Sequence, residues 1–139
     1  MKGKTKYLAL FIALTLALFF IGTAHAAVYT INGDVFTIKI KKQVKKTSSD
    51  AIITVMPLKS YHCNIEYPWK LKIIKSLNLT VKKELYTKDN ATVYSKDSVV
   101  FTVPVAKKKG AGTLNMQLKF SICSETQCFM KTVPLKVSF

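Results

Sequence analysis

The sequence predicts an all-β fold, an immunoglobulin-like antiparallel β-sandwich. Short segments after residue 26 alternate apolar and polar residues, which is typical of strands with one buried face. No segment in this part of the chain keeps the 3.6-residue period of an amphipathic helix. Seven or so such strands, separated by turn-forming residues, occupy about a hundred residues, and this density favours a sandwich.

The first two predicted strands are separated by a short polar segment. Apolar residues alternate with threonine and lysine from Val35 to Lys41, and the polar stretch from Lys45 to Asp50 ends this strand. The second strand, Ala51 to Met56, stops at Pro57, because proline has no N–H to donate to a sheet. Both strands are expected to bury one face.

The middle of the chain contains two more predicted strands and a long loop. Alternation is clear at Leu71–Ile73 and again at Leu77–Val81, with a bend expected near residues 75–76. The segment from Glu84 to Ser98 is mostly polar and is predicted to be an exposed loop.

Three more strands are predicted toward the end of the chain, and the last two of them have the cleanest alternation. The first, Val99 to Val103, is expected to end at Pro104. A lysine and glycine loop, Lys107 to Gly112, follows it. The final two strands, Leu114 to Ile122 and Val133 to Phe139, are expected to be neighbours.

Residues 1–26 have the pattern of a secretory signal peptide. Lysines at positions 2, 4 and 6 precede an apolar run from Tyr7 to Ile21, and Ala24-His25-Ala26 forms a small-residue cleavage site. The run is shorter than the roughly 20 residues of a membrane-spanning helix, although an uncleaved anchor is the alternative. We therefore expect residues 27–139 to form one exported domain, periplasmic or extracellular, without stable membrane insertion.

The charge of the chain limits the classes of partner. All 22 basic residues are lysines and only seven residues are acidic. This excess favours acidic partners or anionic surfaces. Nucleic acid is not expected, because the protein is predicted to be exported and has no arginine for bidentate contacts.

Cys123 and Cys128 are the candidate redox pair. They enclose a four-residue loop between the last two predicted strands, and such a loop closes a hairpin. Directly opposed residues of a hairpin are close enough for a disulfide. Alternation places Cys123 with Lys119, and Cys128 with Thr132, on the polar face, unless a bulge near Met130 shifts the register. Both thiols are therefore expected to be accessible.

The size of the closed loop bears on the role of this disulfide. A six-residue loop stabilises a fold by only about 2 kcal/mol in the chain-entropy model, against roughly 4 kcal/mol for a Cys63–Cys123 bond. Short exposed disulfides exchange readily, and nearby cations favour the thiolate. Lys119 and Lys131 are the nearest cations in sequence, and Glu125 opposes them. A purely structural hairpin disulfide remains the other interpretation.

Cys63 is expected to be a buried, inert thiol. It shares parity with Tyr61 and Ile65 and is left over when the other two cysteines pair. A metal site that combines Cys63 with His62 and Glu66 would be poorly spaced. No metal or other cofactor is predicted.

Two segments resemble a known family. The run from Phe120 to Cys128, followed by Lys131 to Val137, resembles the end of the periplasmic N-terminal domain of the thiol:disulfide interchange protein DsbD and its stand-alone relatives. The run from Tyr61 to Pro68 is similar to the His-x-Asn…Pro element of the same family. The cysteines of the DsbD domain are spaced one residue wider, and its relatives often carry prolines where this chain has Phe129 and Met130.

The resemblance implies an immunoglobulin-like domain whose two cysteines, Cys123 and Cys128, cycle between dithiol and disulfide. It implies electron transfer from a membrane-embedded donor to thioredoxin-like or other periplasmic redox proteins. It also implies an aromatic cap over the disulfide, for which Tyr86 and Tyr94 are the candidates.

The sequence thus supports two main hypotheses from different classes. The first is a periplasmic thiol–disulfide interchange domain, which if active is a protein thiol–disulfide oxidoreductase. The second is a non-catalytic envelope binding module whose hairpin disulfide is structural. A cationic surface-adhesion protein is a third possibility, and it predicts binding that depends steeply on salt.

Overall fold

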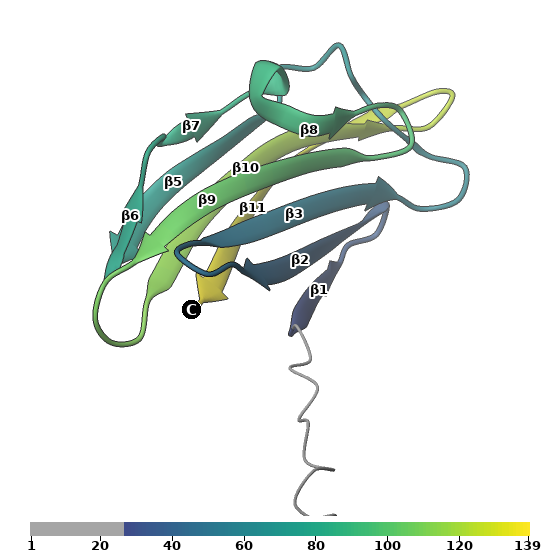
Figure 1. Cartoon of the computed structure of the whole chain (residues 1–139). Helices are drawn as coiled ribbons and strands as arrows, with labels where there is room; N and C mark the ends of the chain where they lie inside the picture. Colours follow the sequence, from purple (N-terminus) through teal and green to yellow (C-terminus); the bar gives the residue numbers. More distant parts are fainter. Residues whose placement is uncertain (1–26) are drawn as a thin grey trace, which may run out of the picture.

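Two antiparallel sheets pack face to face in the computed structural model, which describes residues 27–139 (Figure 1). One sheet has the strand order β1-β2-β3-β9-β6, with β8 also paired to β9; the other has the order β11-β10-β5-β7, with β4 also paired to β10. The predicted all-β, immunoglobulin-like sandwich is confirmed. The predicted signal peptide, residues 1–26, lies outside the described residues.

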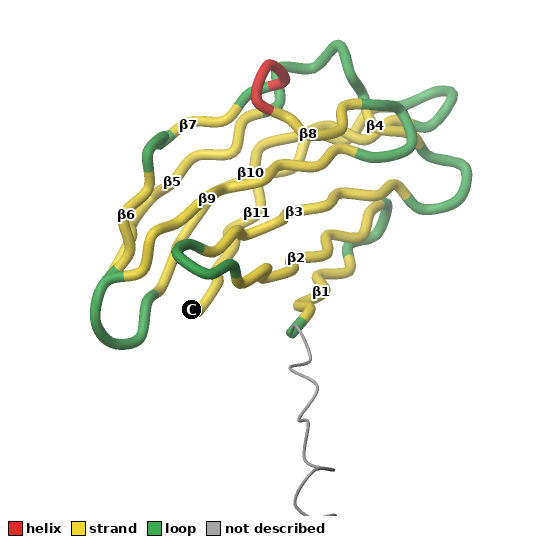
Figure 2. The backbone as a smooth tube through the Cα atoms, viewed as in Figure 1, coloured by secondary structure: helices red, strands yellow, loops and turns green. Residues whose placement is uncertain are grey.

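The elements follow one another with short connections (Figure 2). They are β1 (Val28–Asn32), β2 (Phe36–Val44), β3 (Ser49–Pro57), β4 (His62–Cys63), β5 (Lys70–Leu77), β6 (Leu79–Val81), β7 (Leu85–Tyr86), the 3₁₀-helix η1 (Lys88–Asn90), β8 (Ala91–Tyr94), β9 (Val99–Lys107), β10 (Thr113–Cys123) and β11 (Cys128–Ser138).

The core lies between the sheets and consists of the inward residues of each strand. Every second residue of β10 from Leu114 to Ile122 is buried, as the alternation predicts. Aromatic rings fill the centre: the Phe120 ring meets the Phe36 ring edge to face at 4.9 Å and lies 5.3 Å from the Trp69 ring. Burial of large apolar side chains is the main stabilising term, at about 1.5 to 3 kcal/mol for each.

The structure departs from the sequence prediction at three places. The edge strand β1 was not predicted, because its residues are mostly exposed and leave no alternating pattern. The segment from Glu84 to Ser98 is not simply a loop, since it contains β7, η1 and β8, and Tyr86 is buried. The strand after Val99 does not end at Pro104 but continues to Lys107.

The position of Pro104 explains why the strand continues. On one side β9 pairs with β3 along most of its length. On the other side it pairs with β8 as far as Phe101 and with β6 only from Val105 onwards. Pro104 lies in the gap between these two partners, where a residue without an N–H is tolerated.

The chain changes sheets at Asn78 rather than bending at residues 75–76 as expected. β5 runs to Leu77 in one sheet, and β6 begins at Leu79 in the other. Asn78 has a left-handed backbone, with φ of 53°, and its side-chain Nδ2 donates a hydrogen bond to the carbonyl of Ala111 at 2.9 Å. Asparagine tolerates this conformation better than most residues.

Candidate functional site

The Cys123–Cys128 disulfide joins the last residue of β10 to the first residue of β11. The two residues are directly opposed in the register, and their Cα atoms are 4.0 Å apart. β10 and β11 stay in register along their whole shared length, so the bulge considered near Met130 does not occur. The predicted pairing between adjacent strands is therefore present.

The four-residue loop is closed mainly by Ser124. Its N–H donates to the carbonyl of Gln127 at 2.7 Å. Its Oγ accepts hydrogen bonds from the backbone N–H of Thr126 at 3.3 Å and of Gln127 at 3.1 Å. A serine that bonds its own turn in this way fixes the hairpin end without contributions from other elements.

The two cysteines differ in exposure, and here the prediction that both thiols are accessible was wrong. Cys128 is exposed on the edge strand β11, but only 4% of Cys123 is exposed. Beyond β5, the end of β10 is covered by β4, which places His62 opposite Cys123. As a result Phe120 to Cys123 are buried as four consecutive residues, although alternation predicts that every second one faces solvent.

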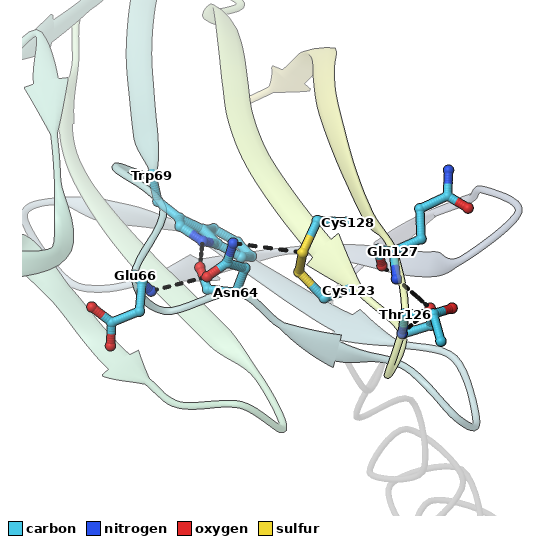
Figure 3. Close-up of a disulfide and its surroundings, with 8 residues drawn as sticks. Asn64, Glu66, Trp69, Cys123, Thr126, Gln127 and Cys128 are labelled. Atoms are coloured by element: carbon cyan, nitrogen blue, oxygen red, sulfur yellow. Dashed lines mark hydrogen bonds between the residues drawn. A yellow bond between two sulfur atoms is a disulfide. The ribbon is translucent and has the colours of Figure 1, made fainter.

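The loop after β4 brings Asn64 to the disulfide (Figure 3). The backbone N–H of Asn64 donates to the carbonyl of Ser121 at 3.0 Å, which anchors the loop to β10. Its Oδ1 accepts from the backbone N–H of Glu66 at 3.1 Å, so Nδ2 points to Cys128 Sγ, 4.0 Å away. The Trp69 indole Nε1 donates to the Asn64 carbonyl at 2.7 Å and ties the loop to the core.

The tyrosines considered as a cap have other positions. Tyr86 is a buried residue of β7, paired with Leu71. The Tyr94 hydroxyl donates to the carbonyls of Ile65 and Tyr67, at 3.2 and 3.1 Å. These two hydrogen bonds hold the loop that follows Asn64 in place. Burial raises the pKa of both phenols, so both stay protonated near neutral pH.

Cys63 is the free cysteine of the described chain, and it is fully buried. Burial, followed by the nearby negative charge of Asp97, raises the pKa of its thiol to about 12. A thiol with this pKa has almost no thiolate at neutral pH and is a poor nucleophile. The prediction that Cys63 is buried is confirmed.

Aromatic and polar side chains lie around the hairpin end of β10 and β11. The Phe129 ring lies 6.3 Å from the Tyr61 ring, and Lys131 Nζ lies 5.9 Å from the centre of the Phe129 ring. Lys131 thus forms a cation–π contact with Phe129. A shallow hollow of about 430 Å³ beside the hairpin loop is lined by Ser60, Ser124, Glu125 and Thr126.

Sequence reasoning missed two groups at this site. Asn64 was noted only as part of a family motif, although its amide is the side chain that reaches the sulfur. Ser121 was expected to face solvent, but its Oγ is buried and has no hydrogen-bond partner among the described residues. Neither could be found from local pattern, because both depend on the loop after β4.

Among residues 27–139, no group of three or more His, Cys, Asp or Glu side chains gathers as a metal site. The structure therefore shows no metal-ligand group formed by His62, Cys63 and Glu66. In the same part of the chain, no helix is long and apolar enough to cross a membrane.

Comparison with known proteins shows similarity in fold only. No protein-family model matches the chain, and no curated protein matches it. Among solved structures, the GAE domain of yeast GGA1 has 10% identity and a TM-score of 0.47, covering 80% of this chain and 98% of that one. The GAE domain of GGA2p from Saccharomyces cerevisiae has 13% identity and a TM-score of 0.47, covering 78% and 94%. The resemblance to the DsbD domain stays a prediction.

Proposed function

We propose that this protein is an exported thiol–disulfide interchange domain that relays two electrons between protein partners through Cys123 and Cys128. The observation that carries the proposal is the unequal exposure of the pair: one sulfur is exposed on an edge strand and the other is buried directly opposite it. This is the arrangement that exchange needs, because a partner must reach only one sulfur.

The exchange follows from this geometry. In the dithiol form, the Cys128 thiolate attacks a sulfur of the partner's disulfide, and the partner's second sulfur leaves as a thiolate. Cys123 then attacks Cys128 Sγ, which re-forms the internal disulfide and releases the partner as a dithiol. Two electrons and two protons pass from the domain to the partner. A dithiol of a donor protein, which the family resemblance places in the membrane, restores the reduced form by the same steps in reverse.

Asn64 supports the role of Cys128 in this scheme. Its Nδ2 points to the sulfur that would carry negative charge in the dithiol form, and an N–H donor stabilises a thiolate more than a disulfide. The weak contact at 4.0 Å in the disulfide form has room to shorten when charge develops. Cys123 attacks within the hairpin, where the strand register already holds it opposite Cys128, and the proton of its thiol passes to the thiolate that the partner releases.

The energy of the disulfide also supports a relay. A six-residue loop contributes only about 2 kcal/mol to stability in the chain-entropy model. The eleven paired positions of β10 and β11 already hold the two cysteines together. The fold therefore has little need of the bond, and the bond can open without loss of the strand pairing.

The reduction potential tests the proposal directly. Purified protein would be equilibrated in glutathione or dithiothreitol buffers, with thiol trapping and mass spectrometry to locate the bond. We expect the Cys123–Cys128 bond to open at about −250 mV or above, as in exchange proteins. A potential below about −300 mV would instead support the envelope binding module with a structural disulfide.

Single-cysteine variants test the order of attack. Cys123→Ser leaves the exposed Cys128 and is expected to accumulate a mixed disulfide with an oxidised thioredoxin-like protein. Cys128→Ser leaves the buried Cys123 and serves as the matched control, which should trap at least tenfold less. Equal trapping by both variants would contradict the proposed role of Cys128.

A further inference from the structure

The outward side of β5, β10 and β11 carries a concentration of positive charge. These three strands contain six lysines and no aspartate or glutamate. Five of the lysines are exposed on the side turned away from the core, and we call them the lysine face: Lys70, Lys72, Lys75, Lys119 and Lys136.

The register places these charges next to one another. Lys70 lies directly opposite Lys119, and Asn115 has Lys75 on one side and Lys136 on the other. Like charges directly opposite on neighbouring strands destabilise a sheet. The ion pair found among residues 27–139 lies elsewhere, between Lys45 in the β2–β3 connection and Asp50 of β3 in the other sheet. The lysine face therefore keeps a repulsion that an anionic partner would relieve.

The outward side of the other sheet differs in composition. There, β2 contributes Lys39 and Lys41, but the outward positions of the central strands include Ile52, Thr54 and Thr102. The lysine excess is thus not spread evenly over the two sheets. It gathers on the sheet that carries the disulfide.

The lysine face is continuous with the exposed sulfur. Along β11, the exposed residues Cys128, Met130, Thr132 and Pro134 lead to Lys136 on one side of the sheet. At about 3.4 Å for each residue, Lys136 lies roughly 27 Å from Cys128. A patch of this width matches the roughly 800 Å² that each partner buries in a standard protein interface.

Apolar groups interrupt the charge on this side. Met130 is 72% exposed next to the disulfide, and Ile74 is 56% exposed where a bulge turns it outward opposite the break between Asn115 and Met116. A hollow of about 640 Å³, lined by Ile74 and Pro134 among others, lies between Lys75 and Lys136. Mixed apolar and charged contacts of this kind are typical of protein interfaces.

We propose that the lysine face is the docking surface for a protein partner with an acidic surface, and that docking there turns the partner's cysteines toward Cys128. This inference rests on the proposed exchange function and names the kind of partner that function would use. Charge complementarity would raise the association rate and orient the partner, because the positive field extends over the path to the disulfide.

Peptide substrates test this inference. A synthetic peptide with one cysteine, held as a mixed disulfide with thionitrobenzoate, would carry a run of glutamates, glutamines or lysines after the cysteine. Reduced protein attacks the peptide disulfide and releases thionitrobenzoate, which is measured by absorbance. Each rate is divided by the rate of the same protein variant with neutral dipyridyl disulfide, so that differences in thiol reactivity cancel.

We expect the glutamate peptide to react at least tenfold faster than the lysine peptide at low salt, and this ratio to collapse at high salt. The triple variant Lys70→Glu, Lys119→Glu and Lys136→Glu should abolish or invert the ratio. The double variant Lys39→Glu and Lys41→Glu on the other sheet is the matched control and should keep it. Equal ratios in the two variants would overturn the inference.

A binding measurement separates this inference from the proposed function. A fluorescein-labelled glutamate peptide without cysteine would be titrated with oxidised protein and followed by anisotropy, which requires no exchange chemistry. Loss of binding in the triple variant, but not in the double variant, supports docking even if the reduction potential proves the disulfide structural. Displacement of the peptide by phosphatidylglycerol vesicles would show that the face binds membrane and would overturn the inference.

Discussion

At the scale of single residues, three cysteines in one small domain have three different environments. Cys63 is buried in the core without a disulfide partner, Cys123 is buried but bonded, and Cys128 is exposed. Position on the sheet contributes to these environments: Cys123 ends the inner strand β10, Cys63 lies on β4 paired to that end of β10, and Cys128 lies on the edge strand β11. Reaction with a partner protein is therefore expected at Cys128 alone in the folded protein.

The raised pKa of Cys63 predicts a loss of stability at high pH. The unfolded chain releases the thiol proton above its ordinary pKa of about 8.5, but the folded chain holds it up to about 12. The free energy of unfolding should therefore fall as pH rises through this window, by up to about 1.4 kcal/mol per pH unit. Urea unfolding of the wild type and of Cys63→Ala at several pH values measures this pH dependence. Titration of the lysines affects both proteins equally, so the difference between them reports Cys63. The prediction would be contradicted if the free energies of unfolding of the two proteins changed with pH in parallel.

Asn64 is predicted to stabilise the thiolate of Cys128. In a Cys63→Ala background, Asn64→Ala should slow alkylation of reduced Cys128 by iodoacetamide at pH 7 by about three- to fivefold, which corresponds to a hydrogen bond of roughly 1 kcal/mol. Asn64→Asp should slow it further, because it keeps the acceptor for the Glu66 N–H but replaces the donor with a negative charge. A faster reaction in Asn64→Ala would show that the amide acts as a shield instead.

At the scale of elements, the short segments between strands decide the site. The loop from Asn64 to Trp69 is fixed at one end by β4, at the other by the Trp69 indole, and in the middle by the Tyr94 hydroxyl. It buries Ser121 and brings an amide to the disulfide. β4 itself is only two residues long, so its pattern in the sequence is too short to predict a strand.

The sheet switch at Asn78 predicts an order of stability among variants. Asn78→Gly keeps the left-handed backbone and loses only the hydrogen bond to Ala111. Asn78→Val also forces a β-branched side chain into that conformation, so it should be less stable than Asn78→Gly by at least about 1 to 2 kcal/mol. Urea unfolding of the two variants measures the difference, and equal stability would mean that the turn at position 78 relaxes.

At the scale of the whole molecule, the core and the strand pairing support the fold without the disulfide. The central aromatic rings and the inward residues of both sheets are buried between the sheets, and the disulfide does not join the two sheets to each other. A domain that cycles between dithiol and disulfide must stay folded in both states. This architecture meets that requirement, because the bond joins two residues that the sheet already holds opposite each other.

Reduction of the disulfide is therefore predicted to lower the free energy of unfolding by only about 2 kcal/mol. Urea unfolding followed by circular dichroism, with and without a phosphine reductant, measures this difference. The far-ultraviolet spectrum should remain that of a β-sheet protein after reduction. Unfolding on reduction at 25 °C would contradict both this prediction and the proposed relay.

Much of this protein could be predicted from local pattern. Alternation gave the all-β class, the core face of β10 and the last two strands as neighbours, because a strand with one buried face repeats every two residues. The four-residue spacing between Cys123 and Cys128 predicted their pairing for a similar reason: hairpin geometry is local. The net charge and the composition follow from the sequence alone.

Tertiary structure alone decided which sulfur a partner can reach. Alternation gives the side of the sheet to which a residue points, but it does not give what covers that side. Segments remote in sequence, β4 and the loop that starts at Asn64, cover the end of β10 and bury Cys123, but leave Cys128 exposed on the edge strand. The same long-range register brought Lys70 opposite Lys119, because strand neighbours depend on the path of the whole chain.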